Sequence, residues 1–163
     1  MTYFPSQRYG DAGAYAAAYF DLIAQGAARI DHDKLAQAGA LLADCAAARR
    51  TIFSCGNGGS AAIANHLVCD CLKGIRTGTA LKPKVQSLSA TIELMTAIVN
   101  DIGPDEMFSF QLESLGEPGD VLIAISSSGA SPNIIRALQC AKNNGLATIA
   151  MTGFSGEIGR AHV

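Results

Sequence analysis

Apolar and β-branched runs alternate with helical patterns along most of this chain. Short runs of that kind predict buried parallel strands at residues 51–55, 85–88, 121–125 and 147–152. Apolar positions spaced three and four apart predict helices, and the expected helices cover residues 11–30, 33–48, 60–73, 90–99, 105–115 and 133–144. Strands that alternate with helices predict an α/β fold, a doubly wound parallel sheet in three α/β/α layers.

Glycine and polar residues indicate where these elements begin and end. Ser60 is the expected N-cap of the helix over residues 60–73, and Gly74 is its expected C-terminal stop. The polar residues 75–84 then predict a surface loop. Residues 100–104, with Gly103 and Pro104 among them, are expected to break the following helical region in two.

Residues 1–50 precede the first strand and predict an N-terminal helical hairpin. Tyr15, Tyr19 and Leu22 recur at helical spacing among alanines, which leaves more apolar surface than one sheet needs. We interpret the hairpin as an oligomerisation element; the alternative is a plain cap on the domain.

The C-terminal region is expected to be incomplete. Residues 51–156 fit an α/β domain that should continue with a further strand and helix, but the chain stops at Val163. Residues 157–163, EIGRAHV, can be back-translated as GAG ATC GGA AGA GCA CAC GTC, a string similar to a common short-read sequencing adapter. We therefore expect residues 157–163 to be a non-native tail.

Composition narrows the function classes. Hydrophobic residues make up 49% and charged residues 16%, which favours a packed domain or an oligomer over a disordered chain. The net charge is −2 and no basic cluster exceeds Arg49 and Arg50, so no nucleic-acid partner is expected. Apolar runs are too short to span a bilayer and the start does not resemble a signal peptide, so we expect no membrane partner and a cytoplasmic location.

The cysteines do not predict a disulfide framework. There are five, an odd number, and no CxxC pair occurs, so a zinc ribbon is not supported either. We expect most of them to be small buried apolar residues. Cys69 and Cys71 flank Asp70, but successive helical positions diverge by about 100°, which excludes a thiolate metal site built from all three side chains.

Two loops with phosphate-binding character follow the first and third strands. The first is Gly56-Asn57-Gly58-Gly59-Ser60, and the second carries Ser126, Ser127, Ser128 and Ser131 before a helix. In a parallel sheet both loops lie at the carboxyl ends of strands, where hydroxyls, amides and helix N-termini can bind a phosphate. Neither is a Walker A motif or a GxGxxG motif, and each alone could be a structural turn. Together they predict a phosphorylated ligand.

His66 and Asp70 form the second candidate site. They lie four residues apart, so they share one face of the helix over residues 60–73 and could form a two-ligand edge of a metal site. The alternative is a packing histidine and a solvated carboxylate.

Four stretches together resemble the SIS (sugar isomerase) domain family, and within it the phosphoheptose isomerases. They are SCGNGGSAA at 54–62, His66 with Asp70, VNDIGPDEMF at 99–108 and GDVLIAISSSGASPNIIRAL at 119–138. The resemblance covers roughly residues 15–156. It implies the flavodoxin-like SIS fold, a homotetramer, and conversion of sedoheptulose 7-phosphate to D-glycero-D-manno-heptose 7-phosphate.

The resemblance also implies roles for single residues. His66 matches a zinc ligand, and Asp70 stands where the family has a glutamate that is both catalytic base and metal ligand. The family completes its zinc site with a glutamine and a histidine on a later helix, which this chain does not contain. The implied substrate-binding residues are Asn57, Gly58, Gly59 and Ser60 in the first loop, Asn100 and Asp101 at the sugar, and Ser126, Ser127, Ser128 and Ser131 at the phosphate.

The implied chemistry suits these residues. Ketose–aldose isomerisation by an enediol route needs a base that moves a proton between C1 and C2, and a group that polarises the carbonyl. The alternative function is a non-catalytic SIS module that binds a phosphosugar in regulation or assembly. The feature that separates them is the His66–Asp70 pair, which a binding module does not need.

Overall fold

The computed structural model describes residue 5 and residues 7–153, so the predicted tail at 157–163 lies outside the described residues. The chain divides into two compact units, residues 1–38 and 39–163. The first holds helix α1 (Ala12–Ala27) and the start of α2 (His32–Ala47). Asp11 caps α1 by accepting a hydrogen bond from the Ala14 amide at 2.8 Å. Both predicted N-terminal helices are thus confirmed, while the hairpin and its oligomerising role stay predictions.

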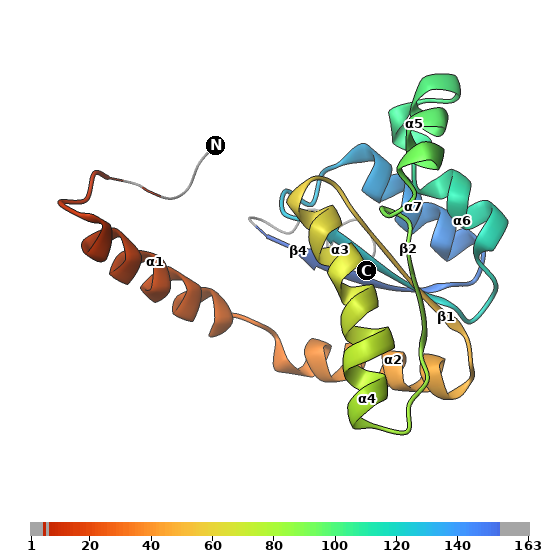
Figure 1. Cartoon of the computed structure of the whole chain (residues 1–163), viewed down its shortest axis with the longest axis horizontal. Coiled ribbons are helices and arrows are strands. Elements are labelled where there is room, and N and C mark those ends of the chain that lie inside the picture. The colour runs from red at the N-terminus through yellow and green to blue at the C-terminus, as the bar shows by residue number, and fades with distance from the viewer. Residues whose placement is uncertain (1–4, 6, 154–163) are drawn as a thin grey trace. The chain divides into compact units, whose positions relative to one another are not determined.

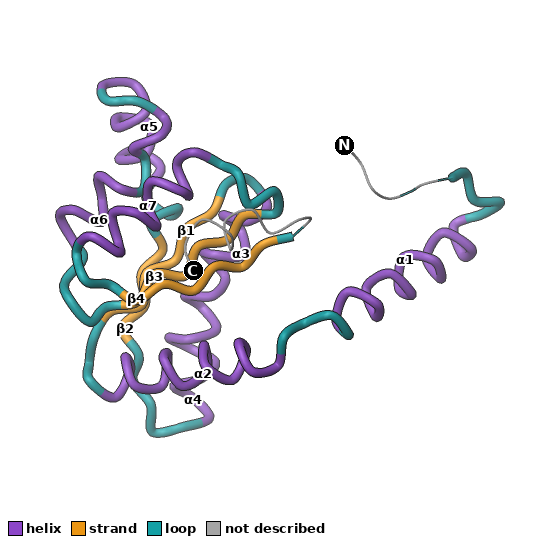
Figure 2. Tube along the Cα trace, turned by 180° about the vertical axis from the view of Figure 1, so that it is seen from behind, coloured by secondary structure: helices purple, strands orange, loops and turns teal. Residues whose placement is uncertain are grey.

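The second unit contains a four-stranded parallel sheet, as predicted (Figure 2). Its strands are β1 (Thr51–Gly56), β2 (Lys84–Ser87), β3 (Val121–Ser126) and β4 (Ala147–Thr152), in the order β2-β1-β3-β4. β1 pairs with both β2 and β3. After β1, the chain therefore adds β2 on one side of β1 and then β3 and β4 on the other.

Helices cover both faces of the sheet, which confirms the doubly wound fold (Figure 1). One face packs Phe53, Leu122 and Ala124 against α6 (Ser109–Leu115) and α7 (Pro132–Asn143). The other face packs Ile52 and Ile123 against α3 (Gly59–Cys69) and the part of α2 from residue 39 onward. Successive residues of β3 alternate between these two cores, so the strand is buried on both sides, as its wholly apolar sequence predicts.

The helix after β1 differs from the prediction at both ends. Its N-cap is Gly58, not Ser60, and it does not stop at Gly74. A π-helical segment η1 (Asp70–Ile75) and a last turn α4 (Arg76–Gly78) continue it into the region predicted as a loop. Cys71 is buried against the sheet, and this burial stabilises η1 although the segment contains Gly74.

The region between β2 and β3 also differs in detail. Helix α5 (Ile92–Asp101) includes Asn100 and Asp101, which were expected in the break. The break itself falls at Gly103, whose φ of 139° is a left-handed backbone conformation. A single 3-10 turn, η2 (Pro104–Glu106), follows, so the predicted helix over 105–115 begins only at Ser109. None of the helices within residues 7–153 is long and apolar enough to cross a membrane.

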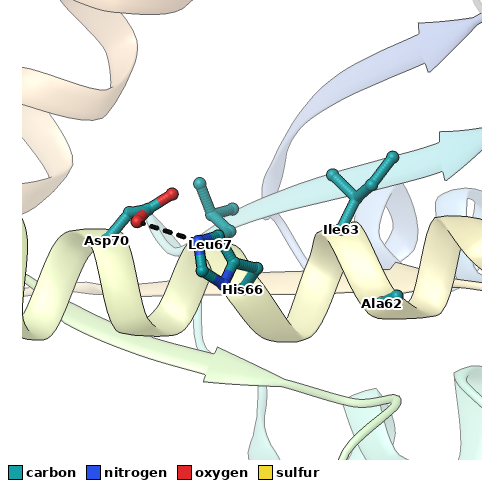
Figure 3. A pocket seen from close by; sticks show the side chains of 5 residues that line it. All are labelled: Ala62, Ile63, His66, Leu67 and Asp70. Carbon is teal, nitrogen blue, oxygen red and sulfur yellow. Dashed lines mark ion pairs between the residues drawn. The ribbon is translucent and has the colours of Figure 1, made fainter.

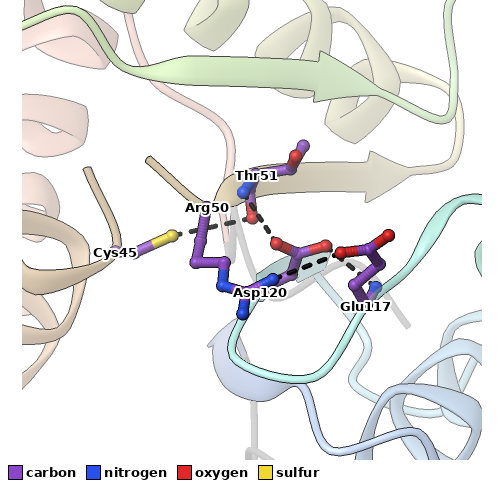
Figure 4. Close-up of polar contacts among 5 residues, drawn as sticks. All are labelled: Cys45, Arg50, Thr51, Glu117 and Asp120. Atoms are coloured by element: carbon purple, nitrogen blue, oxygen red, sulfur yellow. Dashed lines mark hydrogen bonds and ion pairs between the residues drawn. The ribbon is translucent and has the colours of Figure 1, made fainter. Parts of the chain in front are cut away.

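A buried carboxylate ties the amino-terminal ends of β1 and β3 together (Figure 4). Asp120 is 3% exposed and accepts hydrogen bonds from the backbone N–H groups of Thr51 at 2.8 Å and Glu117 at 2.9 Å. Arg50 and Glu117 add a more exposed ion pair at 3.2 Å. These contacts fix the end of the sheet opposite the two candidate loops.

Candidate functional site

Both candidate loops lie at the point where the strand order reverses. β2 is on one side of β1 and β3 is on the other, so the connections that leave the carboxyl ends of β1 and β3 diverge. In doubly wound sheets this crevice is where ligands bind. The glycine turn after β1 and the serine loop after β3 therefore share the ligand-binding edge of the sheet.

The glycine turn is tight because its backbone closes on itself. Gly58 has a φ of 51°, a conformation that glycine adopts without strain. The Ser60 amide donates to the Asn57 carbonyl at 2.9 Å, and the Ala61 amide donates to the Gly58 carbonyl at 3.1 Å. A Cβ atom on Gly56 would lie 2.6 Å from the Ser60 carbonyl group. Only glycine at residue 56 lets strand and helix approach this closely.

A polar network built on two buried serines supports the turn from behind, and sequence reasoning missed it. The Ser89 hydroxyl donates to the Gly56 carbonyl at 2.9 Å and accepts from the Gly56 amide at 3.1 Å. The Ser87 hydroxyl donates to the Asn65 side chain at 2.6 Å, and the Asn65 amide donates to the Ser89 carbonyl at 3.4 Å. The network ties α3 to β2 immediately before His66. Its only signal in the sequence was the pair of serines at the end of the second strand, Ser87 in the strand and Ser89 just after it.

The serine loop wraps around the Ser126 hydroxyl. Ser126 is 5% exposed, and its Oγ accepts a hydrogen bond from the Gly129 amide at 3.2 Å. The Ser131 Oγ lies 3.4 Å from the Ser126 Oγ and makes no cap bond to α7, although Ser131 is its N-cap residue. Ser127 and Ser128 are exposed. Two of the four predicted phosphate-binding serines, Ser126 and Ser131, thus lie close together at the N-terminus of a helix, which favours an anion there.

One side-chain pair joins the two loops. The Asn57 and Asn133 amides donate to each other's oxygen, both at 2.9 Å. Asn57 was predicted as a substrate-binding residue, whereas sequence reasoning missed Asn133. Asn133 is the second residue of α7, the helix that follows the serine loop. The Asn57–Asn133 pair therefore links the glycine turn to the start of α7.

His66 and Asp70 meet on the exposed face of α3 and η1 (Figure 3). The His66 Nε2 lies 3.4 Å from an Asp70 oxygen, and the two side chains are 73% and 63% exposed. With Ala62, Ile63 and Leu67 they line a surface hollow. An exposed pair of this kind contributes little to stability, about 0–1 kcal/mol. The pair is therefore available for binding or chemistry rather than needed for folding.

The pair fits an edge of a zinc site but does not complete one. Two tetrahedral ligands at zinc–ligand distances of about 2.0–2.1 Å lie roughly 3.3–3.4 Å apart, close to the observed separation. A catalytic zinc needs about three protein ligands. Within the part of the chain that the structure describes, no group of three or more His, Cys, Asp or Glu side chains could hold a metal.

The neighbouring cysteines do not extend the pair, as expected. Cys69 is exposed whereas Cys71 is buried, so the two thiols point to different faces. Burial raises the pKa of Cys71, and the Asp70 carboxylate raises it further, which favours the thiol over a metal-binding thiolate. Four of the five cysteines are buried, which confirms that most are small core residues.

The third predicted group lies at the end of α5. The Asn100 amide donates to the Asp101 carboxylate at 2.6 Å, and both side chains are exposed. Asn100 lines a hollow with Met95, Thr96, Val99 and Met107. Among the described residues, no hydrogen bond or ion pair joins this group to the two loops or to His66 and Asp70. The structure thus brings together the loops, and keeps the helix pair and the α5 pair as separate clusters.

Comparison with known proteins agrees with this fold. A family model described as the SIS domain matches residues 14–153. The phosphoheptose isomerase of Colwellia psychrerythraea is 42% identical over 119 residues, 73% of this chain and 60% of that protein. That of Bordetella avium is 42% identical over 126 residues, covering 77% and 64%. The chain therefore spans about three fifths of the length of these curated relatives.

A solved structure covers more of both chains. The phosphoheptose isomerase GmhA from Neisseria gonorrhoeae superposes with a TM-score of 0.81 at 35% identity, covering 91% of this chain and 78% of that one. The Vibrio vulnificus NanR protein complexed with ManNAc-6P superposes with a TM-score of 0.63 at 21% identity, a likeness of fold alone. With a domain match over most of its length and these relatives, the chain belongs to the SIS domain family, on its phosphoheptose isomerase branch.

Proposed function

We propose that the protein is a phosphosugar isomerase that converts sedoheptulose 7-phosphate to D-glycero-D-manno-heptose 7-phosphate. The observation that carries the proposal is the juxtaposition of the glycine turn and the serine loop at the switch point of the sheet, held by the Asn57–Asn133 pair. The similarity of the chain to phosphoheptose isomerases supports the same class of ligand, a phosphorylated sugar.

In this proposal the serine loop binds the phosphate group of the sugar. Ser126 and Ser131 present hydroxyls 3.4 Å apart at the start of α7, and Ser127 and Ser128 are exposed beside them. Phosphate oxygens accept hydrogen bonds from hydroxyls and from the first amides of a helix, whose dipole also favours the negative charge. The serine loop thereby holds the end of the substrate that does not react. The sugar is contacted by two other groups: the glycine turn, including Ser60, and the Asn100–Asp101 pair.

Asp70 acts as the base in this proposal. Its carboxylate takes a proton from C1 of the ketose, which leaves an enediolate with its charge on the C2 oxygen. The O1 hydroxyl proton passes to the C2 oxygen, and the carboxylate returns its proton to C2 as the aldehyde forms at C1. The nearby His66 holds the carboxylate on one side at 3.4 Å. Aspartate is one methylene shorter than the family's glutamate, and about 1 Å of misplacement can cost roughly 10²-fold in rate. Asp70→Glu is therefore expected to change turnover strongly.

His66 and Asp70 are also proposed to supply two ligands of a zinc site. A bound zinc ion would polarise the substrate carbonyl. Its remaining ligands would come from residues that the structure does not describe or from another copy of the chain. Zinc titration by calorimetry tests this separately from activity: binding that His66→Ala abolishes supports the site, and binding that survives His66→Ala contradicts it.

We further propose a cytoplasmic homotetramer. Within the described residues, α1 has no buried side chain, and it exposes Tyr19 by 45%, Phe20 by 65% and Ile23 by 50%. Apolar surface of this extent favours burial against another copy. Light scattering after size-exclusion chromatography tests the state: four copies support the proposal, and a monomer at micromolar concentration contradicts it.

Turnover and binding of the chain separate the enzyme from the non-catalytic module. Sedoheptulose 7-phosphate is incubated with the protein, with and without chelator, and the aldose is detected by proton NMR. Binding is measured in parallel by calorimetry. Turnover that Asp70→Asn lowers by about 10²-fold or more supports the proposal. Phosphosugar binding without turnover in either condition favours the binding module, and neither binding nor turnover overturns both.

A further inference from the structure

The amide of Asn57 is held in one orientation by a residue outside the predicted site. Asn57 and Asn133 exchange two hydrogen bonds, Nδ2 to Oδ1 in each direction, both at 2.9 Å. If either amide turned over by itself, oxygen would face oxygen and N–H would face N–H. Both the oxygen and the nitrogen of the Asn57 amide face Asn133, so the reciprocal pair fixes the position and the plane of the Asn57 amide.

The two partners differ in exposure. Asn133 is 9% exposed, whereas Asn57 is exposed at the start of the glycine turn. An amide carries two N–H donors and two oxygen lone pairs, and the pair uses one of each on both residues. The second donor and second lone pair of Asn57 remain where a ligand between the loops can reach them.

From this geometry we infer that Asn133 is a positioning residue for the proposed reaction: it orients the Asn57 amide toward the sugar while the serine loop holds the phosphate. The inference rests on the proposed function. The inference assigns the Asn57 amide to the sugar portion of the ligand and the serine loop to its phosphate. Loss of Asn133 should therefore weaken the binding of a phosphosugar and leave the binding of inorganic phosphate unchanged.

Neutral variants test the inference without adding charge near the phosphate. The dissociation constants of sedoheptulose 7-phosphate and of inorganic phosphate are measured by calorimetry for the wild type, Asn133→Ala, Asn57→Ala and the double variant. The matched control is Gln139→Ala, which removes an exposed amide from the same helix. One neutral hydrogen bond corresponds to about three- to tenfold in affinity.

The expected result has three parts. Asn133→Ala weakens the phosphosugar by about three- to tenfold and changes inorganic phosphate by less than about twofold. The double variant binds the phosphosugar no more weakly than Asn57→Ala, because Asn133 acts through Asn57. Gln139→Ala changes neither ligand.

Three outcomes would overturn the inference. An unchanged phosphosugar affinity in Asn133→Ala contradicts it alone and leaves the proposed function standing. An equal loss for both ligands marks Asn133 as merely structural, and unfolding in urea then gives the size of that effect. A wild type that binds no phosphosugar overturns the proposed function and the positioning role together.

Discussion

Gly56 is the residue on which the geometry of the candidate site depends most. A Cβ atom there would lie 2.6 Å from the Ser60 carbonyl carbon and oxygen, and 2.7 Å from the Ser60 Cβ, whereas ordinary contact begins at 3.4 Å. Strand β1 cannot easily retreat, because Ser89 holds both the amide and the carbonyl of Gly56. We predict that Gly56→Ala lowers the free energy of unfolding by about 1–3 kcal/mol, the usual cost of overpacking.

Gly59→Ala is the matched control. Gly59 lies three residues further on, is the first residue of α3, and has nothing within 4 Å of an added Cβ. Alanine there should be neutral or should stabilise by about 0.4–1 kcal/mol, because it restricts the unfolded chain. Both variants are unfolded in urea and compared at equal m-values. Equal effects of the two variants, or a Gly56→Ala protein as stable as the wild type, would refute the close approach of strand and helix.

Three further predictions concern the sheet and its thiols. Asp120→Ala should lower the free energy of unfolding by about 3–5 kcal/mol, because two backbone N–H groups lose a buried charged acceptor. Glu117→Ala removes only an exposed ion pair and should lower it by under about 1 kcal/mol. Similar urea midpoints for the two variants would contradict this. An aromatic disulfide reagent at pH 8 should titrate Cys69 rapidly and the buried thiols only after unfolding; several fast thiols would contradict the packing. Burial raises the pKa of Cys55 from 9.0 to about 12, so its contribution to stability is complete below pH 9 and is lost as the pH rises toward 12. Cys55→Ala should therefore lose less stability than the wild type between those pH values, and parallel pH profiles would contradict the shift.

The parallel sheet could be predicted because its strands are short apolar runs buried on both faces. β3 shows this most clearly, because all of its residues are buried and its apolar sequence alone predicts that burial. The two loops followed from the same reasoning, because parallel strands bring their carboxyl ends to one edge. The His66–Asp70 contact followed from helical spacing alone.

The parts that could not be predicted depend on contacts between distant segments. Gly74 resembled a helix stop, but burial of Cys71 against the sheet continues the helix through a π segment. Ser60 resembled an N-cap, but the close approach at Gly56 starts the helix earlier, at Gly59. Asn133 gave no local signal, because its role depends on an amide 76 positions away.

The same limit applies to the proposed metal ligands. Helical spacing identified His66 and Asp70 as a pair on one face, and the structure brings their side chains within 3.4 Å. Neither spacing nor the described residues supply a third ligand. A site of this kind cannot be completed from one helix, since its remaining donors come from other segments or other copies.

The central proposal is that this chain moves a proton between C1 and C2 of a ketose phosphate by means of Asp70. The most direct measurement is hydrogen exchange: sedoheptulose 7-phosphate is incubated with the protein in D₂O, and deuterium at C1 is followed by NMR. We predict exchange with the wild type and a loss of about 10²-fold or more in Asp70→Asn, with sugar binding retained. Exchange that is equally fast in Asp70→Asn, or no exchange with the wild type while the phosphosugar is bound, would contradict the claim.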